Sequence, residues 1–520
     1  MKALQHKGTV ILVGFQDQDN LGVRYLAAAA EKNGFRCKIV SFDQEATGLI
    51  NEIIREKPIL IGFSLIFQYM TPVFAQVIER VRAYDSSAHI TIGGHYSSFE
   101  PETVLNYIPA LDSVIRFDGE ITLALLLQAL SSQNDWRKLK GVAFRGSAGI
   151  VVNPLREPVE DLDSLEEPIR DDIPYEQNQL STASILGSRG CPWNCSFCSI
   201  RPFYEDQGGK LRRLRAPEKV VDEIERIHNE RGVKVFLFQD DDFLASGKRA
   251  RKWSESVAEN IIKRKLNKSL CFKISCRSDE IDFDNMSCLA EAGLTHVYMG
   301  VESGDEQGLI NINKHLKPES HMRAGDILKS LNLSFDFGFM LLEPYSTFNS
   351  IRNNIRFLED FVGDGSTVAG FCRMLPYAGT PVAKKLKSEN RLLGTEFEPD
   401  YKFLDPRLDL YYQWVLNTFY ERNFSSRGLV HILKYLNFEV HLNLKGCNGV
   451  LDKSDIIQLK FFTAWCNRMA CQTLAQALDY FESRTIDQLS LNNEVLMLLT
   501  EKELAVEQEI LSELVCLYKG

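Results

Sequence analysis

Apolar and polar positions form short alternating blocks through the first 145 residues, and each block has the length of one strand or one helix. Apolar runs predict buried strands at 9–14, 37–42, 59–64, 90–94 and 113–117. Between them, apolar residues recur at helical spacing at 21–33, 46–56, 71–84 and 122–131. Strands that alternate with helices predict an α/β domain with a doubly wound, Rossmann-like (flavodoxin-like) parallel sheet over residues 1–145.

A second alternating stretch covers residues 181–390. Its apolar runs predict strands at 184–187, 233–239, 272–276, 295–301, 334–342 and 368–374. Helical patterns lie between these runs, for example at 217–230, 248–265 and 345–361. Six such repeats predict a partial (β/α)6, TIM-like barrel, in which chemistry gathers at the carboxyl ends of the strands.

The remaining two regions do not alternate. Residues 146–180 are polar, acidic and contain proline, which is typical of a linker. Residues 391–520 are rich in leucine, aromatic and charged residues at helical spacing, which predicts a C-terminal, mainly helical domain. A substrate-binding cap over the barrel mouth is one hypothesis for this region, and a plain structural domain is the other.

Composition limits the class of protein. A chain of 520 residues is too long for a single core, in agreement with several domains. The N-terminus shows no signal pattern and no apolar stretch reaches membrane-span length, so we expect a cytoplasmic protein. The net charge of −10 argues against binding to nucleic acid or anionic membranes. In such a protein we expect the 12 cysteines to stay reduced.

The most informative motif is a run of three cysteines. Cys191, Cys195 and Cys198 follow the first predicted barrel strand with the spacing C-x3-C-x2-C. A zinc site is the main alternative, but zinc prefers four ligands, commonly in two separated pairs, and no second pair lies nearby. Iron–sulfur clusters usually take four thiolates, so a set of three leaves one iron open.

The cysteine run, with Phe197 before its last cysteine, resembles the signature of the radical S-adenosylmethionine (SAM) superfamily. The segments 215–224, 236–243, 300–304, 338–344 and 376–381 resemble later motifs of that superfamily, in the same order. The resemblance implies a [4Fe–4S] cluster on Cys191, Cys195 and Cys198, which are then the catalytic cysteines. The resemblance also implies that SAM binds the open iron and is cleaved to a 5′-deoxyadenosyl radical. The cofactors carry the chemistry and the protein orients them.

The same resemblance implies which residues contact SAM, namely Phe197, Asp240, Asp241, Arg277, Glu302 and Ser303. Each has a plainer interpretation. Asp240, Asp241 and Asp242 are also compatible with a solvated strand end, Arg277 with a salt bridge at the barrel rim, and Glu302 with a helix cap.

The first domain resembles the cobalamin-binding domain of the cobalamin-dependent branch of this superfamily. The matching segments are Ser64-Leu65, Gly93-Gly94-His95 and Asp118-Gly119-Glu120. The resemblance implies cobalamin contacts at Asp19, Asn20, Ser64, Leu65, Gly93, Gly94, Gly119 and Glu120. A nucleotide-binding or purely structural module is the alternative, although no G-x-G-x-x-G follows the first strand, so a dinucleotide is not expected.

One position departs from the family pattern. Many cobalamin domains have Asp-x-His-x-x-Gly after the first strand, and their histidine binds cobalt. This chain has Asp17-Gln18-Asp19-Asn20-Leu21-Gly22, so Asp19 stands at the histidine position. The departure implies cobalt without a histidine ligand, or a domain that has lost cobalamin. His95 follows the wrong strand for the usual ligand.

Together these features favour a cobalamin-dependent radical SAM methyltransferase that acts on an unactivated carbon. A radical SAM cyclase or rearranging enzyme, with cobalamin as an electron carrier or absent, is the first alternative. A redox-sensing iron–sulfur protein without turnover is the second. The enzyme interpretations imply a small-molecule or peptide substrate and an electron donor such as flavodoxin or ferredoxin.

Overall fold

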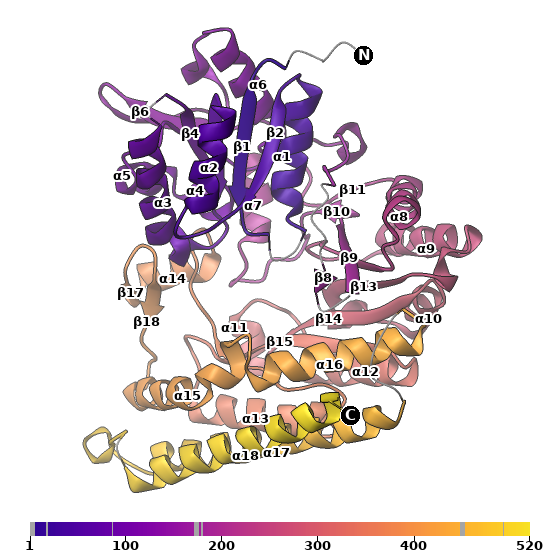
Figure 1. The fold of residues 1–520 in the computed structure, drawn as a ribbon. Coiled ribbons are helices and arrows are strands. Elements are labelled where there is room, and N and C mark those ends of the chain that lie inside the picture. Colours follow the sequence, from indigo (N-terminus) through magenta and orange to yellow (C-terminus); the bar gives the residue numbers. More distant parts are fainter. Residues whose placement is uncertain are drawn as a thin grey trace.

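A computed structural model describes residues 6–16, 19–85, 87–170, 176–177, 180–447, 453–491 and 493–519. The N-terminal domain, the barrel and the C-terminal helices follow one another from top to bottom in Figure 1. None of the described helices is long and apolar enough to cross a membrane.

The N-terminal domain is built on a seven-stranded sheet in the order β2-β1-β3-β4-β5-β6-β7. The first five strands are parallel, and β6 and β7 are antiparallel. Their bounds are β1 Thr9–Gly14, β2 Arg36–Ser41, β3 Leu60–Ser64, β4 His89–Gly93, β5 Ser113–Ile115, β6 Val142–Gly146 and β7 Gly149–Val152. The predicted doubly wound domain is confirmed, and the sheet continues seven residues beyond position 145.

Helices cover both faces of this sheet, and the two faces have separate cores. The helices are α1 Leu21–Lys32, α2 Thr47–Glu56, α3 Thr71–Tyr84, α4 His95–Phe99, α5 Pro101–Tyr107 and α6 Glu120–Ser131. α1 and α6 pack against Val10 and Leu12 on one face, while α2, α3 and α5 pack against Ile11 and Val13 on the other. A parallel strand buried on both faces needs an apolar residue at every position, which explains the uninterrupted run of β1.

The second sheet has the order β16-β15-β14-β13-β12-β9-β8. All neighbours from β9 to β16 are parallel, and the short β8 is antiparallel. The bounds are β8 Glu176–Gln177, β9 Leu180–Ile185, β12 Val235–Phe238, β13 Cys271–Arg277, β14 Leu294–Glu302, β15 Ser334–Leu342 and β16 Cys372–Arg373. This is the expected partial barrel, a curved parallel sheet that is open on one side.

Helices cover the outer face of the barrel sheet. They are α8 Pro217–Arg231, α9 Lys248–Lys263, α10 Phe283–Glu291, α11 Glu306–Asn311, α12 Pro318–Ser330, α13 Phe348–Val362 and α14 Pro381–Ser388. α7 Ile200–Gln207 lies instead against α4 of the N-terminal domain. Two small antiparallel pairs complete this part, β10 Ser188–Arg189 with β11 Arg213–Leu214, and β17 Leu392–Gly394 with β18 Pro399–Tyr401.

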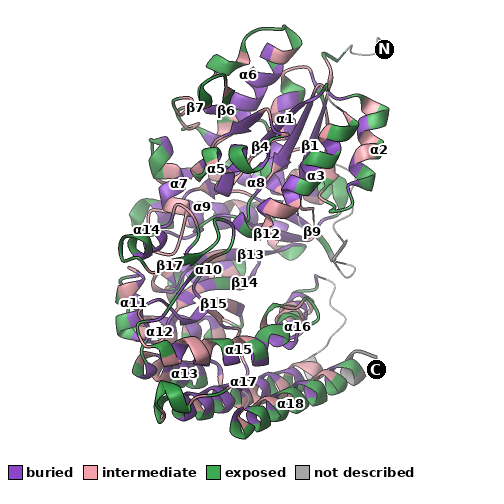
Figure 2. Cartoon of the chain, turned by 90° about the vertical axis from the view of Figure 1, so that its left-hand side faces the viewer, coloured by how far each residue is buried: buried purple, intermediate pink, exposed green. Residues whose placement is uncertain are grey.

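The C-terminal region is mainly helical, as predicted. It contains α15 Pro406–Phe424, α16 Leu429–Leu444, α17 Lys453–Glu482 and α18 Glu494–Lys519. α17 packs between α13 and α18, and Figure 2 shows exposed residues along the outer sides of α17 and α18. Residues of α15 and α17 join the barrel core, so this domain is fused to the barrel rather than tethered to it.

The expectation that all cysteines stay reduced is wrong. Cys271, at the start of β13, forms a disulfide with Cys447, which follows α16. Both residues are buried beside Val235 and Leu442. The expectation of reduced thiols came from the size and composition of the chain, which carry no information on which cysteines meet across 176 residues.

Candidate functional site

The three cysteines lie in the loop between β10 and α7, at the carboxyl end of the barrel strands. All three are partly buried. The backbone N–H of Ile200 donates to Cys198 Sγ (3.5 Å), and Arg277 Nη1 donates to Cys195 Sγ (3.7 Å). Such donors stabilise the charge of metal-bound thiolates.

Burial raises the pKa of each of these thiols, to about 12 at Cys198. At Cys195, the charges of Lys314 and Arg277 partly oppose this rise in pKa. Free thiolates are therefore disfavoured here, whereas coordination to iron deprotonates a thiol outright. Within the described chain, no three His, Cys, Asp or Glu side chains converge on one ion position. In a [4Fe–4S] cluster each cysteine thiolate binds its own iron, so the three sulfurs need not converge on one ion.

Asp240 and Asp241 fix the backbone that leads into the cysteine loop. Asp240 accepts hydrogen bonds from the Gly187 N–H (2.9 Å) and the Ser188 hydroxyl (2.5 Å), and Asp241 accepts one from the Gly190 N–H (2.8 Å). Burial raises the pKa of Asp240 to about 6. Asp240 is therefore no solvated strand end, and the bonds of the two carboxylates order the backbone just before Cys191.

Arg277 lies at the end of β13 and contacts the cysteine loop. Its guanidinium lies over the Trp193 ring (4.0 Å to the centroid), pairs with Asp279 (3.0 Å) and donates to the Lys314 carbonyl (2.8 Å). A SAM carboxylate bound at the cysteine loop would lie near the Arg277 guanidinium, because this guanidinium contacts Cys195 of the loop. The SAM role of Arg277 stays a prediction.

Glu302 ends β14 with a left-handed backbone (φ 69°) and pairs with the buried Lys314 (3.1 Å). The Ser303 hydroxyl donates to Asn354 Oδ1 (3.0 Å) and accepts from the Asp305 N–H (3.1 Å). Ser303 therefore orders its own loop, and Phe197 packs against the barrel core. Sequence reasoning missed Lys314, which lies in the loop after α11 and pairs with Glu302 at the end of β14.

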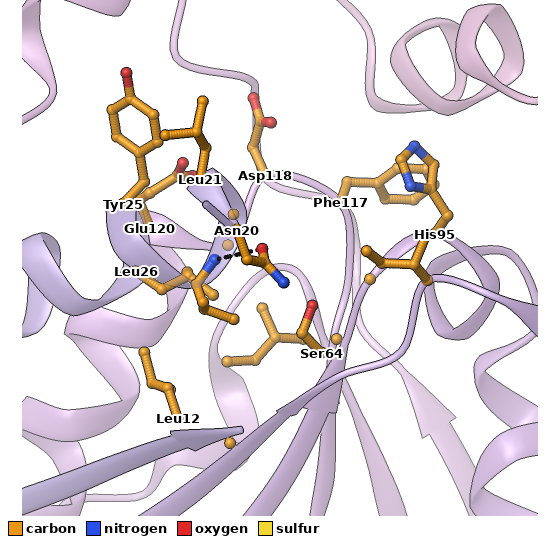
Figure 3. Close-up of a pocket in the computed structure, with 18 of the residues that line it drawn as sticks. Leu12, Asn20, Leu21, Tyr25, Leu26, Ser64, His95, Phe117, Asp118 and Glu120 are labelled. Carbon is orange, nitrogen blue, oxygen red and sulfur yellow. Dashed lines mark hydrogen bonds between the residues drawn. The ribbon is translucent and has the colours of Figure 1, made fainter. Parts of the chain in front are cut away.

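A cavity of about 740 Å³ lies between the N-terminal domain and the barrel. Figure 3 shows the N-terminal wall, with Asn20, Ser64, Phe117, His95 and their neighbours around the carboxyl ends of the strands. Of the expected cobalamin residues, Asp19, Asn20, Ser64, Gly93, Gly94, Gly119 and Glu120 line the cavity. Leu65 is instead fully buried in the core beneath it.

The barrel supplies the opposite wall of the cavity. The lining residues on this side include Leu186, Ser188, Arg189, Phe203, Tyr204, Gln239 and Asp241. Arg189 donates to Glu120 Oε1 (2.7 Å), and Arg213 pairs with Asp118 (2.7 Å), so ion pairs join the walls. The cavity wall thus continues directly into the loop that carries Cys191.

Local backbone geometry explains the residue type at two of the expected cobalamin positions. Gly94 has a φ of 110°, and a Cβ there would lie 2.2 Å from the Leu65 carbonyl oxygen. Only glycine permits this close crossing of the β3 and β4 ends. Asn20 caps α1, since its side chain accepts from the Val23 N–H (3.3 Å).

Two family models match this chain. The B12 binding domain matches residues 8–127, and the radical SAM superfamily matches residues 185–358. The chain is a radical SAM enzyme with a B12-binding domain. Its cofactors are a [4Fe–4S] cluster, SAM and cobalamin.

Two curated relatives and one solved structure show the range of similar enzymes. An uncharacterized methyltransferase of Pyrococcus horikoshii is 26% identical over 425 residues, which are 80% of this chain and 87% of the relative. The anaerobic magnesium-protoporphyrin IX monomethyl ester cyclase of Cereibacter sphaeroides is 27% identical over 324 residues, 61% of this chain and half of the cyclase. The cobalamin-dependent SAM radical enzyme OxsB, solved with aqua-cobalamin and SAM, has the same fold (TM-score 0.74, 16% identity, 99% of this chain and 81% of OxsB).

In this radical SAM enzyme Asp19, which lines the cavity, also makes ion pairs that its sequence position does not indicate. Its carboxylate pairs with Arg24 (2.8 Å) and with Arg170, and accepts from the Ser184 N–H (3.1 Å). Asp17 and Gln18 lie outside the described residues. Because its carboxylate accepts from the N–H of Ser184 in β9, Asp19 links the B12-binding domain to the barrel.

His95 places an imidazole on the cavity wall that the B12-binding domain supplies. Its ring lies 4.3 Å from the Phe203 ring, and within the described residues its buried Nε2 has no hydrogen-bond partner. Burial lowers the pKa of His95 to about 4, so the ring is neutral at physiological pH. Its neutral nitrogen is available to a polar group in the cavity.

Proposed function

We propose that this enzyme transfers a methyl group from SAM, through cobalamin, to an unactivated carbon of a small-molecule or peptide substrate in secondary or cofactor metabolism. When bound, the cluster and SAM supply a 5′-deoxyadenosyl radical, and cobalamin supplies the methyl group. One observation carries the proposal: the cavity of the B12-binding domain is walled by Arg189 and Asp241, and both adjoin the cysteine loop. Radical and methyl carrier would therefore meet in one space.

The chain's own residues contribute orientation and exclusion of water. Asp240 and Asp241 hold the loop before Cys191, and Arg277 places a cation beside Cys195. The Arg189–Glu120 ion pair closes one side of the cavity. Similarity to a protein named as a methyltransferase supports methyl transfer as the outcome.

The test follows the methyl group and needs no substrate. Anaerobic holoenzyme is given SAM with a deuterated methyl group, cobalamin and a reductant, and the corrin is analysed by mass spectrometry. We expect deuterated methylcobalamin together with some 5′-deoxyadenosine. Cys195→Ala should lose the cluster and 5′-deoxyadenosine, whereas Cys288→Ala, a change in α10 on the outer side of the barrel, should keep both. Absence of labelled methylcobalamin from cluster-loaded enzyme would refute methyl transfer.

A cyclase or rearranging enzyme is the second candidate, favoured by the similarity to the cyclase of Cereibacter sphaeroides. It predicts 5′-deoxyadenosine without labelled methylcobalamin in the same experiment. For either reaction we propose a cytoplasmic electron donor such as flavodoxin or ferredoxin. Replacing the chemical reductant by reduced flavodoxin should then sustain cleavage of SAM.

A further inference from the structure

The inner face of the barrel sheet carries polar side chains at the middle of three neighbouring strands. On β13, Phe272 and Ile274 point into the outer core, so Lys273 lies on the inner face. By the same alternation, Tyr298 on β14 and Asp336 on β15 share that face. Tyr298 is 37% exposed, while its neighbours Val297 and Met299 are fully buried. The inner face is therefore open at this level.

Other parts of the structure limit this inner face of the barrel sheet at both ends. At the lower end, α16 packs on β14 and β15, and the Phe438 ring lies 5.1 Å from the His296 ring. The Cys271–Cys447 disulfide fixes the chain just after α16 to β13. At the upper end lie Glu302 and Lys314, next to the cysteine loop. A molecule on this face would thus lie between the α16 floor and the radical site.

Lys273 is the unusual member of this group. Within the described chain its ammonium has no hydrogen bond and no carboxylate within ion-pair distance, and its Nζ lies 6.0 Å from the centroid of the Tyr298 ring. Asp336 pairs instead with His296 (3.4 Å). Burial lowers the pKa of Lys273, so its surroundings disfavour an unpaired charge. Such a charge is costly unless a counter-ion arrives with a ligand.

We propose that Lys273 anchors an anionic group of the substrate, a carboxylate or a phosphate, inside the barrel, with Tyr298 beside it. The inference rests on the proposed function, because it assumes a substrate that reaches the radical. Tyr298 and Glu302 are four residues apart on β14, or about 13 Å. The anionic group therefore lies on the order of a dozen ångströms from the reacting carbon, which limits the substrate to a small or extended molecule.

The test compares three two-carbon aldehydes that differ in charge. Anaerobic holoenzyme is treated with glycolaldehyde, glyoxylate or glycolaldehyde phosphate. The lysine amine condenses with the aldehyde, water leaves, cyanoborohydride reduces the imine, and peptide mass spectrometry locates the label. We expect Lys273 to react roughly tenfold faster with an anionic aldehyde than with the neutral one, since charge-assisted contacts have about this strength. The faster of the two anions identifies the carboxylate or the phosphate.

Two controls isolate the effect of the site. The exposed Lys252 on α9 should show no such preference, and Asp336→Asn should increase the preference at Lys273 because a competing carboxylate is removed. Equal rates for neutral and anionic aldehydes, or no labelling of Lys273, would overturn the inference. Labelled methylcobalamin is measured on the same sample, so a failure of the anchor is distinguishable from a failure of the proposed function.

Discussion

At the scale of single residues, Arg277 links the cluster loop to the barrel. It contacts Cys195 Sγ (3.7 Å) and the Trp193 ring (4.0 Å), and its charge opposes the rise in the pKa of Cys195 that burial causes. In Arg277→Gln the pKa of this thiol should rise further. We expect cluster reconstitution to require a higher pH, with iron content reduced severalfold at pH 7.

The measurement is iron and sulfide per chain after reconstitution across a pH series. Arg264→Gln is the matched control, because Arg264 pairs with Asp222 (2.8 Å) and Glu225 (2.9 Å) at the surface, far along the chain from the cluster loop. An Arg277→Gln profile identical to that of the wild type would show that the guanidinium does not act on the thiolate.

The candidate residues that sequence reasoning could name are those whose signal is local. The three cysteines stand within eight positions, and Gly93-Gly94 and Gly119 stand at strand ends, where a pattern is visible in one segment. Lys314 and Arg189 were missed because each matters through partners elsewhere, Glu302 for one and Glu120 for the other. The residues next to a position in the sequence do not show which distant residue its side chain contacts.

At the scale of elements, the turn from β4 into α4 shapes the cavity wall. Gly94 has positive φ and almost touches the Leu65 carbonyl. Gly94→Ala should displace this turn, lower the free energy of unfolding by about 1–3 kcal/mol and reduce the cobalamin retained after gel filtration. Gly48→Ala in α2 is the control, since a Cβ there meets nothing within 4 Å. Unchanged retention of cobalamin by Gly94→Ala would argue against this turn as part of the corrin site.

The C-terminal helices contain a carboxyl group that makes stability depend on pH. Burial raises the pKa of Glu507 on α18 from 4.5 to about 7, although Arg422 lies 3.9 Å away. The folded carboxyl keeps its proton up to about pH 7, while the unfolded one loses it near 4.5. Between these values stability falls as pH rises, by at most about 3 kcal/mol.

Glu507→Gln should therefore flatten the pH dependence of the melting temperature between pH 5 and 8. Differential scanning calorimetry of wild type and variant measures this directly. The exposed Glu513 on the same helix provides the control, and Glu513→Gln should keep the wild-type slope. A Glu507→Gln slope as steep as that of the wild type would assign the pH dependence to other groups.

Elements were predictable where periodicity was strong. The parallel strands of both sheets and the long helices appear at or close to their expected places, because their apolar runs and helical spacing are clear in the sequence. The β6–β7 hairpin was missed, since an antiparallel pair at a sheet edge has half-exposed residues and a short turn. A cap over the barrel mouth was one of two hypotheses for the C-terminal region, and it stays untested; in this region α16 packs on β14 and β15.

At the scale of the whole molecule, a series of ion pairs between alternating basic and acidic side chains joins the domains. Arg24 on α1 pairs with Asp19, Asp19 with Arg170, and Arg170 with Glu223 on α8 (2.8 Å). Arg170 also donates to the Ser184 carbonyl of β9 (2.8 Å). The B12-binding domain, the linker and the barrel therefore share one buried network, which fixes the two walls of the cavity relative to each other.

The network predicts that Asp19 acts on cobalamin through domain placement. Asp19→Asn leaves two buried guanidinium groups without their shared carboxylate, and breaking a buried pair costs about 3–5 kcal/mol. We expect a lower melting temperature and a smaller rise on adding cobalamin, because a ligand stabilises only the arrangement that binds it. Asp222→Asn, which removes an exposed pair with Arg264, should change neither value. If Asp19→Asn keeps the wild-type rise with cobalamin while its melting temperature drops, Asp19 stabilises the fold without positioning the cavity walls.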